Sequence, residues 1–229
     1  MAGIVFHSME GSSYLWSVMQ IADEKGVPYE LKVPTLHSPE HFKLHPFGKM
    51  PVLQHGEVIL YESLAIAHYI DKAFDGPPLQ PRDALGQAQV LRWISIVNSY
   101  VFPVMNRFFK ERIVRPAWGF ETDQAFVDTA KAPLELQVRL IDEAAGAEGF
   151  LVGNRLTIAD CFLFPNLLFF SLTTEGAALL AQYKGATDWL ARMRARPSYP
   201  GSIMQRSFGE TAKLAEGLRQ MPLPVHTSR

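Results

Sequence analysis

Cysteine is almost absent from this sequence, because Cys161 is its single cysteine among 229 residues. One thiol cannot form an intrachain disulfide, and it cannot supply the CxxC pair of a dithiol oxidoreductase. The sequence therefore excludes a protein that works by forming and breaking its own disulfide.

Long apolar runs are also missing. The richest stretch, residues 161–172, is interrupted by Pro165 and Asn166, and it falls short of the ~20 residues that cross a bilayer. Its length and composition favour a buried core helix. The first residues, MAGIVFHSMEG, lack the basic segment and long apolar core of a secretory leader. We therefore expect a cytoplasmic protein without membrane association.

Neither sign of charge is in excess. The chain has 22 Lys and Arg against 23 Asp and Glu, a formal net charge of -1, and a hydrophobic share of 48%. These values are typical of an ordinary globular protein. The one short basic run, at Arg192, Arg194 and Arg196, fits a helix end, where the helix dipole favours cations. We therefore expect no nucleic-acid partner.

The first third of the chain alternates short β-prone runs with helical patterns. We predict strands at residues 3–7, 29–33, 51–54 and 57–60, and helices at 14–25, 38–44 and 62–74. The resulting order is βαβ followed by ββα, which is that of a thioredoxin-like domain with a mixed sheet. We assign this α/β domain to residues 1–76.

Turn residues and prolines gather in residues 77–83, which we interpret as a linker between domains. No strand pattern follows it. We predict helices at residues 84–100, after Pro103, and at 123–145, 158–168, 187–194 and 208–219, with the tail 221–229 on the surface. Residues 84–229 are therefore expected to form an all-α helical-bundle domain.

Three sequence segments carry recognisable local chemistry. The first is the hydroxyl-rich turn SSYLWSV at residues 12–18, and the second is PFGKMPVL at residues 46–53 followed by the pair Glu62-Ser63. The third, GNRLTIAD at residues 153–160, contains a capping box, in which Thr157 and Asp160 bond each other's backbone amides. Losing such a cap typically costs about 1 kcal/mol, so the third segment supports folding and does not identify a substrate.

Together with the domain order, these segments resemble the cytosolic glutathione S-transferase superfamily over most of the chain. The first segment is similar to the serine-type turn of zeta-, phi-, tau- and theta-like members, which suggests a bacterial or fungal member. The resemblance implies a glutathione-binding thioredoxin-like domain, a helical domain and a cis peptide bond before Pro51. It also implies a homodimer, with Phe47 as the aromatic residue that inserts into the partner subunit. Burial of Phe47 within one subunit is the alternative.

The resemblance assigns Ser12 as the catalytic residue. A thiol with a pKa of about 8.5 is only slightly ionised at neutral pH. A serine hydroxyl at a helix start can donate to the sulfur, and the helix dipole adds positive charge. From position alone, the N-cap of the following helix is the better explanation of Ser12. Ser13 and Tyr14 are the rival hydroxyls, with Ser13 placed second.

The remaining glutathione contacts are also implied by the resemblance. The helix start at Ser63 would hold the γ-glutamyl carboxylate, Glu62 would pair with the ammonium, and the backbone of Met50 would meet the cysteinyl part. Lys49 and His37 are expected near the charged ends of the tripeptide, although an exposed lysine in a loop is usually only solvated and a surface role is the better explanation of His37. The full predicted set is His37, Lys49, Met50, Pro51, Glu62 and Ser63.

The electrophile would lie between the domains, beside apolar side chains of the first long helix of the second domain. We predict Met9, Tyr100, Met105, Phe108 and Phe109 there, although most aromatic residues at such spacing belong to a core. No metal is expected, because Pro39 and Pro46 prevent one helix from carrying His37, His41 and His45 together.

The expected activity is that of a glutathione S-transferase (EC 2.5.1.18-type), a detoxification enzyme that transfers glutathione to a small hydrophobic electrophile. Glutathione is then a co-substrate. Glutathione-dependent isomerisation and dehalogenation are alternatives, although position 14 is Tyr where zeta members carry cysteine. A non-catalytic binding or scaffold protein with this fold is the rival from another class.

Overall fold

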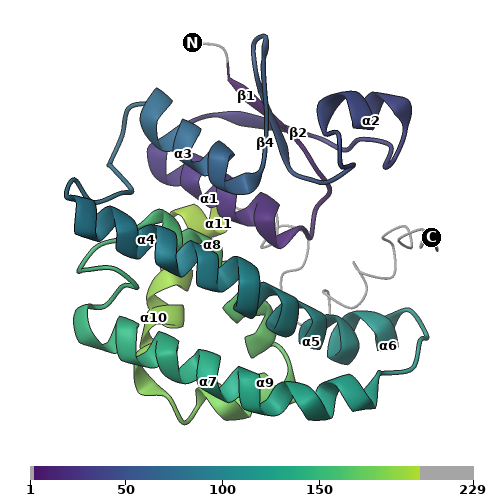
Figure 1. The fold of residues 1–229 in the computed structure, drawn as a ribbon, viewed down its shortest axis with the longest axis vertical. Helices are drawn as coiled ribbons and strands as arrows, with labels where there is room; N and C mark the ends of the chain where they lie inside the picture. Colours follow the sequence, from purple (N-terminus) through teal and green to yellow (C-terminus); the bar gives the residue numbers. More distant parts are fainter. Residues whose placement is uncertain (1–2, 202–229) are drawn as a thin grey trace.

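The computed structural model describes residues 3–201, which form a small α/β domain and a larger helical domain (Figure 1). The predicted helix 208–219 and the tail 221–229 lie outside these residues. The strands are β1 (Ile4–His7), β2 (Tyr29–Lys32), β3 (Val52–His55) and β4 (Val58–Tyr61). They form one mixed sheet in the order β2-β1-β3-β4, with β1 parallel to β2 and the other two pairings antiparallel. The predicted βαβ-ββα order is confirmed.

Helices α1 (Ser13–Lys25) and α3 (Ser63–Ala73) lie between the sheet and the helical domain, and α2 (Pro39–Leu44) lies apart from them (Figure 1). Each begins close to its predicted position. Helix α1 ends at Gly26, whose φ of 67° is the left-handed conformation that glycine adopts without a Cβ clash. Ser38 caps α2 by accepting from the His41 amide at 3.1 Å, and Pro39 fills the first helical position.

The helical domain begins with a continuous helical run from residue 84 to 117, and here the sequence prediction of a break near Pro103 is wrong. The run comprises α4 (Ala84–Ile96), η1 (Val97–Asn106), α5 (Arg107–Phe109), η2 (Lys110–Val114) and α6 (Arg115–Ala117). Segments η1 and η2 have the wider turns of a π-helix, which allow the chain to pass Pro103. Near this proline, the Gln137 side chain donates to the Tyr100 carbonyl at 2.9 Å.

The rest of this domain is formed by α7 (Gln124–Glu148), α8 (Ile158–Ser171), α9 (Thr174–Leu180), α10 (Lys184–Arg194) and the short α11 (Ser198–Gly201). The sequence patterns miss α9 and α11 and begin α10 three residues late. Among the described residues, no single helix is long and apolar enough to cross a membrane. Helices α8 and α9 meet that test only as a pair, and they are bent by 115°.

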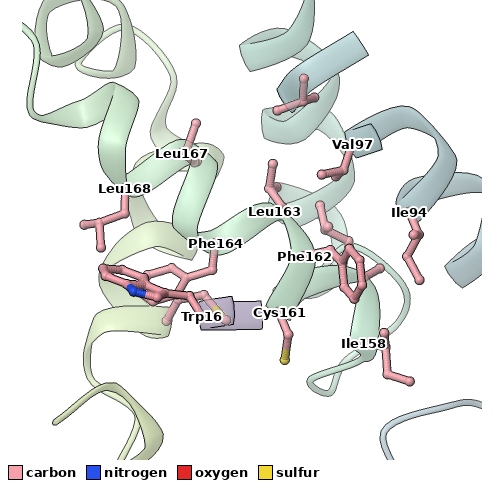
Figure 2. Close-up of a cluster of buried hydrophobic side chains, with 14 of the residues drawn as sticks. Trp16, Ile94, Val97, Ile158, Cys161, Phe162, Leu163, Phe164, Leu167 and Leu168 are labelled. Atoms are coloured by element: carbon pink, nitrogen blue, oxygen red, sulfur yellow. The ribbon is translucent and has the colours of Figure 1, made fainter. Parts of the chain in front are cut away.

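Helix α8 is buried on all sides and forms the centre of the molecule. Figure 2 shows its side chains Phe162, Leu163 and Phe164 within a cluster that also includes Trp16 of α1 and Val97 of η1. The start of α8 is fixed by the predicted pair: Asp160 accepts from the Thr157 amide at 2.9 Å and from its hydroxyl at 2.8 Å. The capping box is therefore confirmed.

The connection between the domains is held by a buried polar network. Lys25 of α1 donates to the backbone oxygen of Asp71 at 3.0 Å, and the Asp71 carboxylate accepts from the Leu79 amide at 2.8 Å. The Leu79 carbonyl in turn accepts from the amide of Ile158, the first residue of α8, at 3.0 Å. The connecting segment therefore positions α8 relative to α1 and α3.

Candidate functional site

The first part of the site is the turn between β1 and α1. Gly11 has φ of 90°, which turns the chain after the strand, and Ser12 follows in an extended conformation. The Ser12 Oγ accepts from the Leu15 amide at 3.3 Å, so Ser12 is the N-cap of α1, the alternative that position alone had favoured. A hydroxyl that accepts one bond still has its hydrogen to donate. The partly exposed Ser12 therefore combines a donor with the positive end of a helix.

The two rival hydroxyls lie in different surroundings from Ser12. Ser13 is the first residue of α1 and is buried. The Tyr14 hydroxyl donates to Oδ1 of Asn98 in η1 at 3.1 Å, and the Tyr14 ring lies 4.7 Å from that of Phe102. Burial, and secondarily the negative charge of Glu62, raises the pKa of Tyr14 to about 12. Tyr14 therefore stays neutral and joins the active-site turn to the helical domain.

The second part is the loop between α2 and β3. The Met50–Pro51 peptide bond is cis, as the resemblance implied. Gly48 has φ of 59°, and a Cβ there would lie 2.9 Å from the rings of His37 and Phe42, so the loop needs glycine at this position. The Lys49 side chain is exposed, and its carbonyl oxygen lies 3.1 Å from Nε2 of His41. His37 comes just before α2 and is exposed, and its ring lies beside that of His41.

The third part is the start of α3. Glu62 precedes the helix with φ of 69° and ψ of 112°, a conformation that only glycine adopts without strain. Its side chain is exposed, and within residues 3–201 no side-chain hydrogen bond caps this helix start. Ser63 is half-buried as the first helical residue. The amides at the start of α3 are therefore left for an anionic ligand.

The starts of α1 and α3 lie at the same end of the sheet, because His7 at the end of β1 pairs with Val52, and Val52 pairs with Tyr61, which precedes Glu62. A groove of about 860 Å³ runs from Glu62 and Leu64 of α3 to Leu91 and Asn98 of the facing helical run. A second depression, of about 380 Å³, lies between the start of α4 and the end of α7 and contains none of the predicted site residues. Of the predicted site residues, only Glu62 lines the larger groove, which otherwise follows α3 and α4.

The predicted electrophile residues fall into two groups. Met9 is half-buried next to the α1 turn, and Tyr100 is 63% exposed. Met105, Phe108 and Phe109 are 0%, 1% and 5% exposed, and Phe109 stacks on Phe169 of α8 with ring centroids 4.7 Å apart. These three side chains belong to the core and present no surface to a ligand. Their spacing had allowed this alternative.

Phe102 is a residue that the sequence reasoning missed. It is half-buried, and its ring lies against that of Tyr14, which comes two residues after Ser12. Phe102 and Tyr14 are 88 positions apart in the sequence. Helical spacing held a weak signal for it, because Phe102 is three and six residues from Met105 and Phe108 in a run that proves to be continuous.

The three histidines around α2 have separate environments. Helix α2 spans only Pro39–Leu44. The His41 ring accepts from the His37 amide at 3.1 Å, and the His45 ring accepts from the Phe47 amide at 3.3 Å. Within the described part of the chain, no group of three His, Cys, Asp or Glu side chains is arranged to hold a metal ion.

The geometry defines a class: a thioredoxin-like domain with a cis-proline loop, a helix start capped by Ser12 and, among the described residues, a second helix start without a side-chain cap, joined to a helical domain. Family models confirm that class. The one described as the N-terminal domain of glutathione S-transferase matches residues 6–78, and the one for the C-terminal domain matches residues 124–192.

Individual proteins agree. Glutathione S-transferase 4 of Zea mays is 30% identical over 194 residues, which cover 82% of this chain and 86% of the relative. Glutathione S-transferase F4 of Arabidopsis thaliana is 28% identical over 206 residues, covering 86% and 84%. The solved structure of glutathione S-transferase-I bound with lactoylglutathione is 26% identical with a TM-score of 0.80, covering 87% of this chain and 98% of that one. The chain belongs to the glutathione S-transferase family.

Proposed function

We propose that this chain is a glutathione transferase in which Ser12 stabilises the thiolate of bound glutathione for attack on a small hydrophobic electrophile. The observation that carries the proposal is the Ser12 hydroxyl at the start of α1, which follows the end of β1. There His7 pairs with Val52, next to the cis-proline, and Val52 pairs with Tyr61, next to the start of α3. Family membership and the similarity to named glutathione S-transferases over most of the chain support the same activity.

The chemistry at Ser12 concerns the sulfur's proton. Each unit by which the thiol pKa falls requires about 1.36 kcal/mol of preferential stabilisation of the thiolate. The Ser12 hydroxyl supplies a hydrogen bond to the sulfur, and the α1 start supplies a partial positive charge. Ser12 is then a stabiliser and not the nucleophile, so no covalent enzyme intermediate forms.

The tripeptide is proposed to span the three parts of the site. Its γ-glutamyl carboxylate meets the backbone amides at Ser63, and its ammonium meets the exposed Glu62 carboxylate. Its cysteinyl part pairs with the backbone of Met50, which the cis bond to Pro51 turns toward the site. Lys49 and His37 complete the binding set at the charged ends.

The electrophile is proposed to lie on the other side of the sulfur, toward Met9, Tyr14 and Phe102. Tyr14 and Phe102 come from different domains and form a continuous apolar wall. Tyr100 remains a candidate at the rim, because its side chain is exposed.

The assembly proposed is a homodimer. Phe47 is 71% exposed at the tip of its loop, and Leu91 is 52% exposed beside the groove between α3 and α4. The exposed Phe47 is available as the aromatic residue that the family resemblance inserts into the partner subunit. Light scattering of the purified chain tests this, with Phe47→Ser expected to shift the mass toward the monomer.

The domain division proposed is residues 1–76, a linker at 77–83, and residues 84–229.

The experiment that tests the activity is a pH titration of bound glutathione, followed by the ultraviolet absorbance of its thiolate. We expect a depressed thiol pKa in the native protein that returns toward the free value in Ser12→Ala. Ser13→Ala and Tyr14→Phe should keep the depressed value. A native protein that binds glutathione without lowering its thiol pKa would instead be the binding or scaffold protein. Product analysis with a haloaromatic and a cis-enediolic acid separates conjugation and dehalogenation from isomerisation.

A further inference from the structure

His45 is a buried side chain that touches two parts of the site at once. It follows α2, and its side chain is only 3% exposed. Its Nδ1 accepts from the Phe47 amide at 3.3 Å, within the loop that leads to Met50. Its Nε2 lies 4.0 Å from Oε1 of Glu62, and its ring packs against Tyr61 of β4 with centroids 4.7 Å apart.

We propose that His45 is a positioning residue for glutathione, which holds the Phe47–Met50 loop and the Glu62 carboxylate in their binding arrangement while its ring is neutral. This rests on the proposed function, because it assigns the placement of groups that contact the tripeptide. His45 itself is covered by Tyr61 and the loop and is not a ligand contact.

The hydrogen bonds determine the state of the ring. Because Nδ1 accepts from the Phe47 amide, the neutral ring carries its proton on Nε2, on the side of Glu62. Glu62 sits in a strained backbone conformation that its surroundings must maintain. Tyr61 immediately precedes it and packs on the same ring, so His45 supports the turn that begins α3.

Protonation of His45 would disturb its contacts with both the Phe47 amide and the Glu62 carboxylate. Nδ1 would become a donor facing the Phe47 amide, which is itself a donor, so that bond would be lost. The cationic ring would also attract the Glu62 carboxylate and compete with the ammonium of glutathione. Both effects weaken glutathione binding, so the neutral ring is the binding form.

The charged groups around His45 come from three segments. Burial lowers the pKa of His45, the Glu62 carboxylate at the start of α3 opposes this, and His41 of α2 and Lys49 of the loop add to the lowering. The ring is therefore neutral at pH 7 and charges below its ordinary value of 6.5. Because the proposed function lowers the thiol pKa of bound glutathione, the probe is S-methylglutathione, which has no thiol. Its carboxyl groups titrate near 3.5 and its amine above about 7.5, so its charge is constant between pH 5 and 7.

The test measures S-methylglutathione affinity by calorimetry between pH 5 and 7 for the native protein, His45→Asn and His45→Ala. An asparagine side chain can accept from the amide two residues ahead without titrating. We expect native affinity to fall about tenfold by pH 5, where a protonated ring loses its acceptor. His45→Asn should keep affinity at pH 7 within about threefold and be flat with pH, since its acceptor is retained.

His45→Ala removes the acceptor, and we expect about tenfold weaker affinity at pH 7, appearing in the KM for glutathione with kcat nearly unchanged. His55→Asn is the matched control: His55 is half-buried in the same sheet and bonds Tyr69 at 2.9 Å, away from Glu62. It should keep the native pH dependence.

The outcomes separate the inference from the function on which it rests. A native protein that binds no glutathione at any pH overturns the proposed function. A native protein that binds, but whose pH dependence persists in His45→Asn or disappears in His55→Asn, overturns the role of His45 alone. If His45→Ala lowers thermal stability while folded protein keeps native affinity, His45 is structural and the positioning role is wrong.

Discussion

Helices α1 and α8 both begin at a hydroxyl residue, but the two starts differ in what remains available. At α8 the Asp160 carboxylate, fully buried, accepts from the Thr157 amide and hydroxyl, the Leu151 amide and the Trp189 indole. At α1 a single bond of 3.3 Å joins Ser12 to the Leu15 amide, and the hydroxyl is partly exposed. A helix start whose hydrogen-bond donors are all paired within the protein stabilises the fold. A helix start that keeps a hydrogen-bond donor available can bind a ligand.

The same distinction separates the site from the core more generally. The start of α3 has no side-chain cap among the described residues, and α3, like α1, borders the site. The molecule therefore places its closed helix start at the centre and the starts of α1 and α3 at the predicted site, which leads to four expectations.

The largest expected effect is the loss of the closed start. Asp160→Ala leaves four buried donors without their acceptor, so we expect the free energy of unfolding to fall by about 4 kcal/mol. Urea unfolding measures this. Asp188→Ala, which breaks the exposed pair with Lys184, is the control and should change stability by less than about 0.5 kcal/mol. A loss below 1 kcal/mol for Asp160→Ala, on the scale of a single cap, would remove the contrast between α8 and α1.

Loss of the open start should affect catalysis more than folding. Ser12→Ala is expected to lower kcat/KM about 100-fold, the scale for removing one donor from a developing negative charge. Its stability should fall by about 1 kcal/mol, the value of a cap. Asp83→Ala removes the cap of α4, where Asp83 accepts from Gly86 at 2.8 Å, and is the matched control. It should lose similar stability and keep its activity; equal activity losses would refute a special role for Ser12.

The other end of α1 is anchored by charge. Arg196 donates to both oxygens of Glu24, at 2.6 and 2.7 Å. Burial of Glu24 raises its pKa, but the hydrogen bonds from Arg196 and Ser198 outweigh this and hold it below the usual 4.5. A lowered pKa gives stability above pH 4.5 that is lost as pH falls through the folded value. Because the pair is partly exposed, Glu24→Gln should cost only about 1 kcal/mol at pH 7.

The measurement for this pair is the unfolding free energy as a function of pH. The difference between the native protein and Glu24→Gln should shrink toward zero as Glu24 protonates. Glu143→Gln, in the exposed pair with Arg139, should leave the pH curve unchanged. A difference that stays constant from pH 7 to 3 would show that the ion pair is not its source.

The smallest effect is expected at Tyr14. Tyr14→Phe removes a single bond from the half-buried Tyr14 to the exposed Asn98, so stability should fall by less than about 1 kcal/mol. The thiol pKa of bound glutathione should not move, since Ser12 is intact. A double-mutant cycle with Asn98→Ala measures the coupling between the domains. A tenfold loss of kcat in Tyr14→Phe would transfer the catalytic role from Ser12.

The local features of this fold could be predicted from the sequence. The four strands and the cap at Ser38 follow from alternation and turn residues that act within about ten positions. The cis-proline loop and the pair Glu62-Ser63 came from the family resemblance, because no local rule assigns a ligand to them.

Features that depend on distant contacts could not be predicted. The helix passes Pro103 because its turns widen there, in a region supported by Gln137 from a different helix. Tyr14 meets Phe102 only after the domains pack together. Burial of Phe108 and Phe109 depends on where α8 lies, and their spacing is the same for a core and for a ligand-binding wall.

The left-handed backbone at Glu62 has a consequence for how this protein would change under selection. A non-glycine residue held at φ of 69° and ψ of 112° costs on the order of 1–3 kcal/mol. Variants chosen only for heat resistance should therefore accumulate glycine at this position, and each would gain stability while discarding the carboxylate. At position 62, selection for stability and selection for activity therefore favour different residues.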